Sequence, residues 1–200
     1  MQDRKKITKE DLVDILKNHQ LYLNNKTKNR TDLNYANLRG TDLSYADLRS
    51  TNLRDADLSY ADLSYADLSY ADLRNADLRN ADLRNADLRN ADLRNADLKD
   101  TDLRNADLRN ADLRDTDLRD TDLRDTDLRD TDLRIYTTDI WTCYITSTDI
   151  RIGCQYHTVK KWEFFNDDTI SKMETRALKW WHINKSTIFS IVNSIKNTTY

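Results

Sequence analysis

A step of five residues dominates this sequence. Leucine recurs at every fifth position from Leu33 to Leu133, which makes 21 leucines without a gap. With each leucine taken as position i, position i−2 is always Ala or Thr and position i−1 is Asp or Asn. Position i+1 is mostly Arg, and position i+2 is mostly Asn, Asp or Tyr. The fold therefore has to give a leucine the same environment once in every five residues.

Neither a helix nor a straight strand can do this. A helix turns about 100° per residue, so a step of five rotates successive leucines by roughly 140° and leaves no apolar stripe. In a strand the side chains alternate, so an odd step sends successive leucines to opposite faces. A corner in each repeat removes both problems, because positions i and i−2 then point inward. Four corners close a square coil, and coils stacked about 4.8 Å apart can satisfy one another's backbone groups.

The repeat A-[DN]-L-x-x resembles that of the pentapeptide-repeat proteins, and the match covers about half of the chain. The resemblance implies an all-β solenoid, a right-handed quadrilateral β-helix. This agrees with the square coil, although the handedness comes from the family alone. The region from Ile152 to Trp181 also resembles the tails of phage and bacterial members of the family to which no function is assigned.

The repeat divides the chain into three segments. Residues 1–30 should contain a capping helix near 9–20, with Thr8 as its N-cap, and a lead-in to the first coil. An open coil end needs such a cap, and binding of a partner by the helix is the alternative. Residues 31–152 should form the β-helix. Its last three sides would centre on Ile140, Ile145 and Ile150 after a phase shift near 135–137, which makes six coils.

Residues 153–200 should form a small α-helical module. Thr158 can cap a first helix, and the sequence offers several caps for a second helix that runs to Trp181. A third apolar segment follows around 188–195. The possible caps of the second helix are Asp167, Asp168 and Thr169.

Two groups of residues are candidates for binding a partner. Tyrosine fills position i+2 in the early repeats, and a coil of twenty residues should stack Tyr45 on Tyr65. Surface tyrosines are common interface anchors, while packing between coils is the alternative. The tail carries more aromatic residues than a simple plug needs, so it is expected either to cap the coil alone or also to form a homodimer. The candidates are Tyr35, Tyr45, Tyr60, Tyr65, Tyr70, Trp180, Trp181, Ile188, Phe189 and Val192.

Charge and motifs argue against most other functions. Residues 31–135 hold 25 Asp and 16 Arg or Lys, a net charge of −9, and no basic patch for direct nucleic-acid binding stands out. The N-terminus lacks an apolar signal region and no segment is apolar enough to span a membrane, so a cytoplasmic protein is expected. Cys154 and His157 have a C-x-x-H spacing, but a zinc site needs about four ligands. We therefore expect no metal, cofactor or enzyme activity.

Two functions remain. The first is a non-enzymatic structural or protein-interaction module with an unknown protein partner. The second follows from the family resemblance, since some members are dimeric DNA mimics that bind type II topoisomerases such as gyrase. Duplex DNA carries one negative charge per ~1.7 Å, nearly three per ~4.8 Å coil. A net charge of −9 over about five coils is below two per coil, which favours the interaction module.

Overall fold

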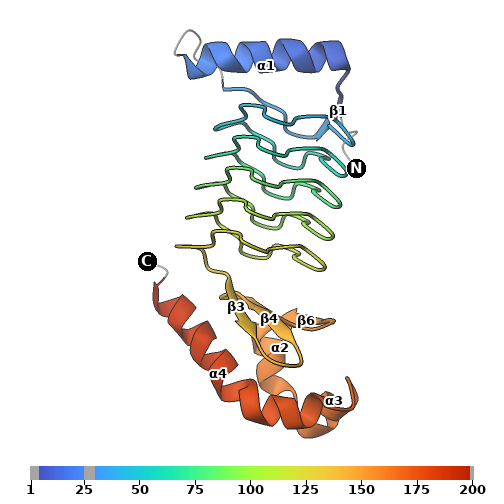
Figure 1. Ribbon diagram of the computed structural model, residues 1–200, viewed down its shortest axis with the longest axis vertical. Coiled ribbons are helices and arrows are strands. Elements are labelled where there is room, and N and C mark those ends of the chain that lie inside the picture. Colours follow the sequence, from blue (N-terminus) through green and yellow to red (C-terminus); the bar gives the residue numbers. More distant parts are fainter. Residues whose placement is uncertain (1–4, 25–29, 199–200) are drawn as a thin grey trace. The chain divides into compact units, whose positions relative to one another are not determined.

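A computed structural model describes residues 5–24 and 30–198 of the chain (Figure 1). Residues 1–4 and 25–29 of the predicted N-terminal segment lie outside the described residues. The chain divides into two compact units, Met1–Thr131 and Asp132–Tyr200. The first holds β1 (Lys5–Lys6), α1 (Lys9–Leu23), β2 (Ala36–Asn37) and the repeats. The second holds β3 (Arg134–Thr137), β4 (Thr142–Ile145), β5 (Asp149–Ile152), β6 (Gln155–Thr158), α2 (Val159–Phe164), α3 (Asp167–Ser171) and α4 (Ala177–Thr198).

The repeats of the first unit pair in parallel with a register of twenty residues. A bridge joins position i−1 of one repeat to position i−1 four repeats later, from Asp32↔Asn52 to Asp107↔Asp127. One such bridge recurs every five residues, so each coil carries four of them. Figure 1 shows the coils stacked one after another along this unit. The coil of four five-residue sides that the leucine step predicts is therefore present.

Every backbone amide of a repeat has an acceptor, as residues 71–75 illustrate. The amide at i−2 closes a turn on the preceding leucine, and the amides at i−1, i and i+2 bond to carbonyls of neighbouring coils. The amide at i+1 bonds to the aspartate side chain of its own repeat, which forms an Asx turn. The bonds are Ala71 N to Leu68 O (3.0 Å), Asp72 N to Thr51 O (3.0 Å), Leu73 N to Asp92 O (2.8 Å), Arg74 N to Asp72 Oδ1 (3.3 Å) and Asn75 N to Arg94 O (3.1 Å). Buried amides demand such partners, so position i−1 needs a side-chain oxygen.

The corner lies at position i+2. All residues at this position from Tyr35 to Asp130 have φ between 54° and 63°, in the left-handed region. Gly, Asn and Asp adopt this conformation with the least strain, which explains why Asn and Asp fill most of these positions. Gly40 occupies one of them, and tyrosine occupies five.

The interior of the coil consists of leucine with Ala or Thr. The leucines from Leu33 to Leu118 are at most 5% exposed. The inward threonines find the backbone acceptors that they need, because the hydroxyl of Thr101 donates to the carbonyl oxygen of Leu78 in the preceding coil at 2.7 Å. The predicted inward direction of both positions is confirmed.

Helix α1 packs on the first coil. Thr8 caps it, and the side chains and amides of Thr8 and Asp11 form a reciprocal capping box. His19 is fully buried, and its ring nitrogens lie 2.9 Å from Thr31 Oγ1 and 3.4 Å from Thr51 Oγ1. Burial lowers the pKa of His19. The predicted helix and its N-cap are confirmed, and its contacts agree with a capping role.

The second unit differs from the prediction. Strands β3, β4, β5 and β6 form an antiparallel sheet in sequence order, so the three extra coil sides predicted at Ile140, Ile145 and Ile150, and the total of six coils, are wrong. The step of five has another cause here, because Ile145 and Ile150 pair across a hairpin whose turn is closed by Thr146 N and Asp149 O at 2.9 Å. A hairpin with a four-residue loop produces the same spacing as a coil corner.

The helices of the second unit cover this sheet with aromatic residues. Thr158 caps α2 as predicted, but Asn166 rather than Asp167, Asp168 or Thr169 caps α3. Helix α4 runs unbroken through two segments that the sequence predicts as separate. Cys143 is fully buried and lies on strand β4 of the sheet. The core consists of Cys143, Ile145, Ile150, Ile152, Val159, Trp162, Ile170, Ala177, Trp180, Trp181, Ile188, Val192 and Ile195.

The coil interior leads to a first prediction. Leu83 is fully buried, so Leu83→Ala should lower the free energy of unfolding by about 2–5 kcal/mol through lost contacts and a cavity. Arg84→Ser at the neighbouring outward position should lower it by less than about 1 kcal/mol. Urea unfolding followed by circular dichroism measures both. Equal losses would contradict an inward leucine.

Candidate functional site

The structure separates the predicted interaction residues into two groups. Tyr45, Tyr60, Tyr65 and Tyr70 are exposed, with 74%, 54%, 52% and 61% of each residue accessible, and Tyr35 is half-buried. The C-terminal candidates lie elsewhere: Trp180, Trp181, Ile188 and Val192 are buried in the core of their own unit, and Phe189 packs against it. Only the tyrosines are placed where a partner can reach them.

We define Tyr45, Tyr60, Tyr65 and Tyr70 as the tyrosine surface. The rings of Tyr45 and Tyr65 stack as predicted, with centroids 4.9 Å apart and planes inclined by 2°. Tyr60, Tyr65 and Tyr70 occupy three consecutive corners of the coil, since each lies five residues after the last. The surface is therefore an exposed aromatic band that extends around the coil.

The backbone of these tyrosines is strained. Each has φ between 58° and 61°, a conformation that a bulky L-residue adopts only at a cost of roughly 1–2 kcal/mol. Asn occupies the same corner column further along, at Asn85 and Asn105, without this penalty. Strained positions of this kind cluster at functional sites, so the tyrosines need a reason other than the fold.

Small serines accompany the tyrosines. Ser precedes Tyr45, Tyr60, Tyr65 and Tyr70 at position i+1, where most other repeats carry Arg. Ser59, Ser64 and Ser69 are at most 8% exposed. Each donates its hydroxyl to the aspartate two residues earlier, at 2.6–2.7 Å. Serine leaves room for the tyrosine ring and supplies no positive charge.

The presence of serine in place of arginine makes the tyrosine surface more negative. Residues 41–70 contain six Asp and two Arg, a net charge of −4, whereas residues 71–100 contain seven Asp and six Arg or Lys, a net charge of −1. One arginine, Arg39, shows how a cation lies against the tyrosine surface. The guanidinium carbon of Arg39 is 4.4 Å from the ring centroid of Tyr60, and Nη1 donates to Ser59 Oγ at 2.9 Å.

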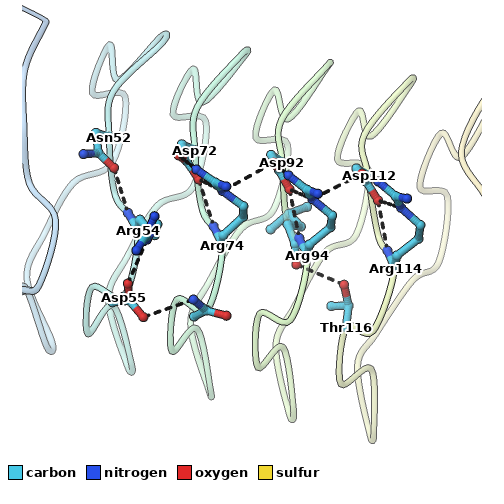
Figure 2. Close-up of polar contacts among 12 residues, drawn as sticks. Asn52, Arg54, Asp55, Asp72, Arg74, Asp92, Arg94, Asp112, Arg114 and Thr116 are labelled. Atoms are coloured by element: carbon cyan, nitrogen blue, oxygen red, sulfur yellow. Dashed lines mark hydrogen bonds and ion pairs between the residues drawn. The ribbon is translucent and has the colours of Figure 1, made fainter. Parts of the chain in front are cut away.

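Beyond the tyrosines, arginine and aspartate form a continuous ladder, which Figure 2 shows for one face. Arg74 donates two hydrogen bonds to Asp72, from Nε to Oδ1 at 2.8 Å and from Nη2 to Oδ2 at 2.6 Å. Its Nε also lies 3.5 Å from Asp92 Oδ2 in the next coil, and Arg94 repeats this contact toward Asp112 at 3.5 Å. The ladder offsets the repulsion between stacked like charges.

The arginines hold the pKa values of their aspartates down. The hydrogen bond from Arg129 lowers the pKa of Asp127 to about 2. Hydrogen bonds from the arginine two residues on lower the pKa values of Asp72, Asp82, Asp102, Asp107 and Asp122 as well. These carboxylates are ionised at neutral pH and occupied by their arginines, so they are poor acids or bases for catalysis.

Cys143 and His157 both lie in packed surroundings. Burial raises the pKa of the Cys143 thiol to about 12, so it stays protonated at neutral pH. The ring of His157 packs on Trp162 and Phe165, with centroids 5.5 and 5.1 Å away. Among residues 5–24 and 30–198, no three His, Cys, Asp or Glu side chains gather closely enough to hold a metal ion. Within the same ranges no helix is both long and apolar enough to cross a membrane.

Comparisons with known proteins identify the repeat. The family model described as Pentapeptide repeats matches residues 29–59, 61–100 and 96–134. No curated protein sequence matches the chain significantly. Among solved structures, the chain is similar to a pentapeptide repeat protein of the Arabidopsis thaliana thylakoid lumen, with 33% identity over 49% of this chain and 68% of that one and a TM-score of 0.48.

Two further solved structures are similar over half of the chain. Rfr23 from the cyanobacterium Cyanothece 51142 shares 36% identity over 50% of this chain and 63% of its own, with a TM-score of 0.40. QnrB1, a plasmid-mediated fluoroquinolone resistance protein, shares 22% identity over 50% of this chain and 58% of its own, with a TM-score of 0.30. The chain thus spans only part of the length of each of these proteins.

The ladder of arginine and aspartate predicts that acid lowers the free energy of unfolding. Because the folded pKa values lie below the ordinary value of 3.8 and reach about 2 for Asp127, the unfolded chain takes up protons first as the pH falls. The free energy of unfolding should therefore decrease between about pH 4 and 2, separately from the decrease below about pH 6.5 that the lowered pKa of the buried His19 causes. Urea unfolding at a series of pH values measures this.

A matched variant identifies the source of the acid sensitivity. Arg74→Gln/Arg94→Gln removes two guanidiniums from the ladder and should lose less stability over the same pH interval than the wild type. An identical decrease in both proteins would show that these pairs do not cause it.

Proposed function

Since the chain belongs to the pentapeptide-repeat family, we propose that it is a non-enzymatic interaction module that binds a basic protein segment on its tyrosine surface. We infer that its repeats wind as the right-handed quadrilateral β-helix of the family. The four bridges per twenty residues support the square section, and the hand is taken from the family. A cytoplasmic location belongs to the same proposal.

The exposed stack of Tyr45 on Tyr65 is the observation that carries the proposal. Both rings are more than half accessible, and both stand on a left-handed backbone that asparagine would adopt with less strain. Tyrosine is among the residues that contribute most to binding at protein interfaces. The fold alone gives no reason to place two of them on one corner column.

The charge around the rings indicates the chemistry of the partner. The net charge of −4 over residues 41–70 attracts cations and repels acidic surfaces. Arginine fits best, because its guanidinium stacks on aromatic rings and pairs with carboxylates, as Arg39 does on Tyr60. We therefore expect an arginine-bearing segment rather than an acidic or purely apolar one.

The alternative, mimicry of DNA toward a type II topoisomerase such as gyrase, has less support. A mimic needs accessible negative charge along its length, whereas the arginines of residues 71–100 lie on the aspartates and leave a net charge of only −1 there. A gyrase supercoiling assay separates the two functions. Inhibition or protection by micromolar protein would favour mimicry.

A homodimer through the second unit is a separate proposal. It would have to use exposed apolar residues such as Phe164 and Ile183, which are 78% and 65% accessible, because Trp180 and Ile188 are part of the core. Light scattering of the intact chain and of Phe164→Ser/Ile183→Ser tests it. A monomer in both cases would exclude the dimer.

Two fluorescent peptides of equal length and charge, one of arginines and one of lysines, test the tyrosine surface. We expect the wild type to bind the arginine peptide several-fold more tightly in fluorescence anisotropy. Tyr45→Asn/Tyr65→Asn should abolish this preference, because the stacked rings are removed. The double variant should change the free energy of unfolding by less than about 1 kcal/mol, since relief of strain and loss of the stack oppose each other.

Asn85→Gly/Asn105→Gly is the matched control, because it changes the same corner column in the next two coils and keeps the left-handed backbone accessible. This variant should retain the preference for arginine. Equal binding of both peptides by the wild type would refute the proposed partner chemistry, and an unaltered preference in the tyrosine variant would place the binding elsewhere.

A further inference from the structure

A small cavity lies within the second unit. Its volume is about 100 Å³ and its wall is mainly apolar. Four indole rings line it, Trp141 from the β3–β4 turn, Trp162 from α2, and Trp180 and Trp181 from α4. Large rings in a core normally fill the space between them, so a cavity lined by four indoles departs from ordinary packing.

The indole rings present carbon rather than N–H groups to the cavity in at least two cases. Trp162 Nε1 donates to the carbonyl oxygen of Ile150 at 2.9 Å, and Trp180 Nε1 donates to Thr138 Oγ1 at 2.9 Å. Trp141 and Trp180 meet edge to face, with centroids 5.1 Å apart. With these donors engaged, the two rings offer carbon and little to bind an anion.

Gly153 allows Trp141 to form its part of the wall. A Cβ atom at this position would lie 3.1 Å from Cδ1 of Trp141, tighter than ordinary contact, and the glycine has φ of +54°. The turn between β5 and β6 therefore brings its backbone directly against the indole. The neighbouring Cys154 is exposed and also lines the cavity.

One carboxylate lies in the wall of the cavity, paired with an arginine. Within the described part of the chain, the lining contains one charged side chain, that of Glu174, which is 41% exposed. The backbone amide of Arg176 donates to Glu174 Oε2 at 3.0 Å, and Arg176 Nε lies 3.4 Å from Oε1. These contacts hold the carboxylate in place beside the indoles.

The wall and the rim select the kind of ligand. The faces of indole rings attract cations, and a carboxylate adds to this. A primary ammonium or a guanidinium would lose hydrogen bonds in an apolar cavity, whereas a quaternary ammonium has none to lose. The volume of about 100 Å³ admits only a few small groups, which suits a head group with three methyl groups and little more.

We propose that this cavity binds the trimethylammonium group of a small free molecule, with the indoles around the methyl groups and Glu174 at the rim. The site lies in the second unit and does not depend on the function proposed for the tyrosine surface.

Choline and its neutral isostere 3,3-dimethylbutan-1-ol test the proposal, because they share one shape and differ in charge. Titration of the full chain followed by tryptophan fluorescence should show saturable binding of choline, at least about tenfold tighter than the isostere. Glu174→Gln should weaken choline binding several-fold and leave the isostere unaffected. Glu163→Gln on α2, an exposed carboxylate outside the cavity, should bind choline like the wild type.

Cys154 provides a second measurement that needs no variant. Burial raises the pKa of the other thiol, Cys143, to about 12, so a thiol reagent at neutral pH reports on Cys154. Choline should slow this reaction and the isostere should not. Equal affinity for both compounds, binding of neither, or binding to phosphatidylcholine vesicles without any response to free choline would each overturn the proposal.

Discussion

The left-handed corner at every fifth residue is the constraint on which the first unit depends. It turns the chain so that successive leucines point to one interior, and it is held by the aspartate or asparagine at i−1, whose side chain accepts the amide of i+1. For residues 71–75 these contacts leave no backbone amide without an acceptor. A repeat that lost the side-chain oxygen at i−1 would leave an amide unpaired inside the stack, where it would cost about 1–3 kcal/mol.

The fold constrains three positions of each repeat and leaves the other two free to vary. Positions i−2, i−1 and i are committed to the interior and the turn, while i+1 and i+2 face outward. The middle repeats use this freedom for a charge-balanced ladder, in which Arg74 bonds to Asp72 and reaches Asp92. Each pair is partly exposed and contributes little alone, but the column as a whole keeps stacked aspartates compatible. The early repeats use the same positions for serine and tyrosine.

The step of five was sufficient to predict the coil because a helix and a strand both fail with it, and the stacking of Tyr45 on Tyr65 followed from the twenty-residue turn. After Arg134 the same step wrongly predicts further sides of the coil. Ile145 and Ile150 pair across a hairpin and have the same five-residue spacing as the leucines. Only the backbone pairing distinguishes a hairpin from a side of the coil. The aromatic load of the tail predicts Trp180 and Ile188 as interaction residues, whereas the structure buries both. As one continuous helix, α4 turns both toward the core, and no local pattern marks that choice.

The residue at position i+1 constrains the residue at position i+2. Serine precedes Tyr45, Tyr60, Tyr65 and Tyr70, and no arginine precedes a tyrosine within the repeats. An arginine that bonds to its own aspartate occupies the space beside the corner that a tyrosine ring needs. Ser64 bonds to the equivalent aspartate oxygen and is much smaller. Exchanging arginine for serine thus opens the surface and removes a positive charge in one step. An aromatic corner and a net negative charge therefore arise together, which is the combination that a guanidinium recognises.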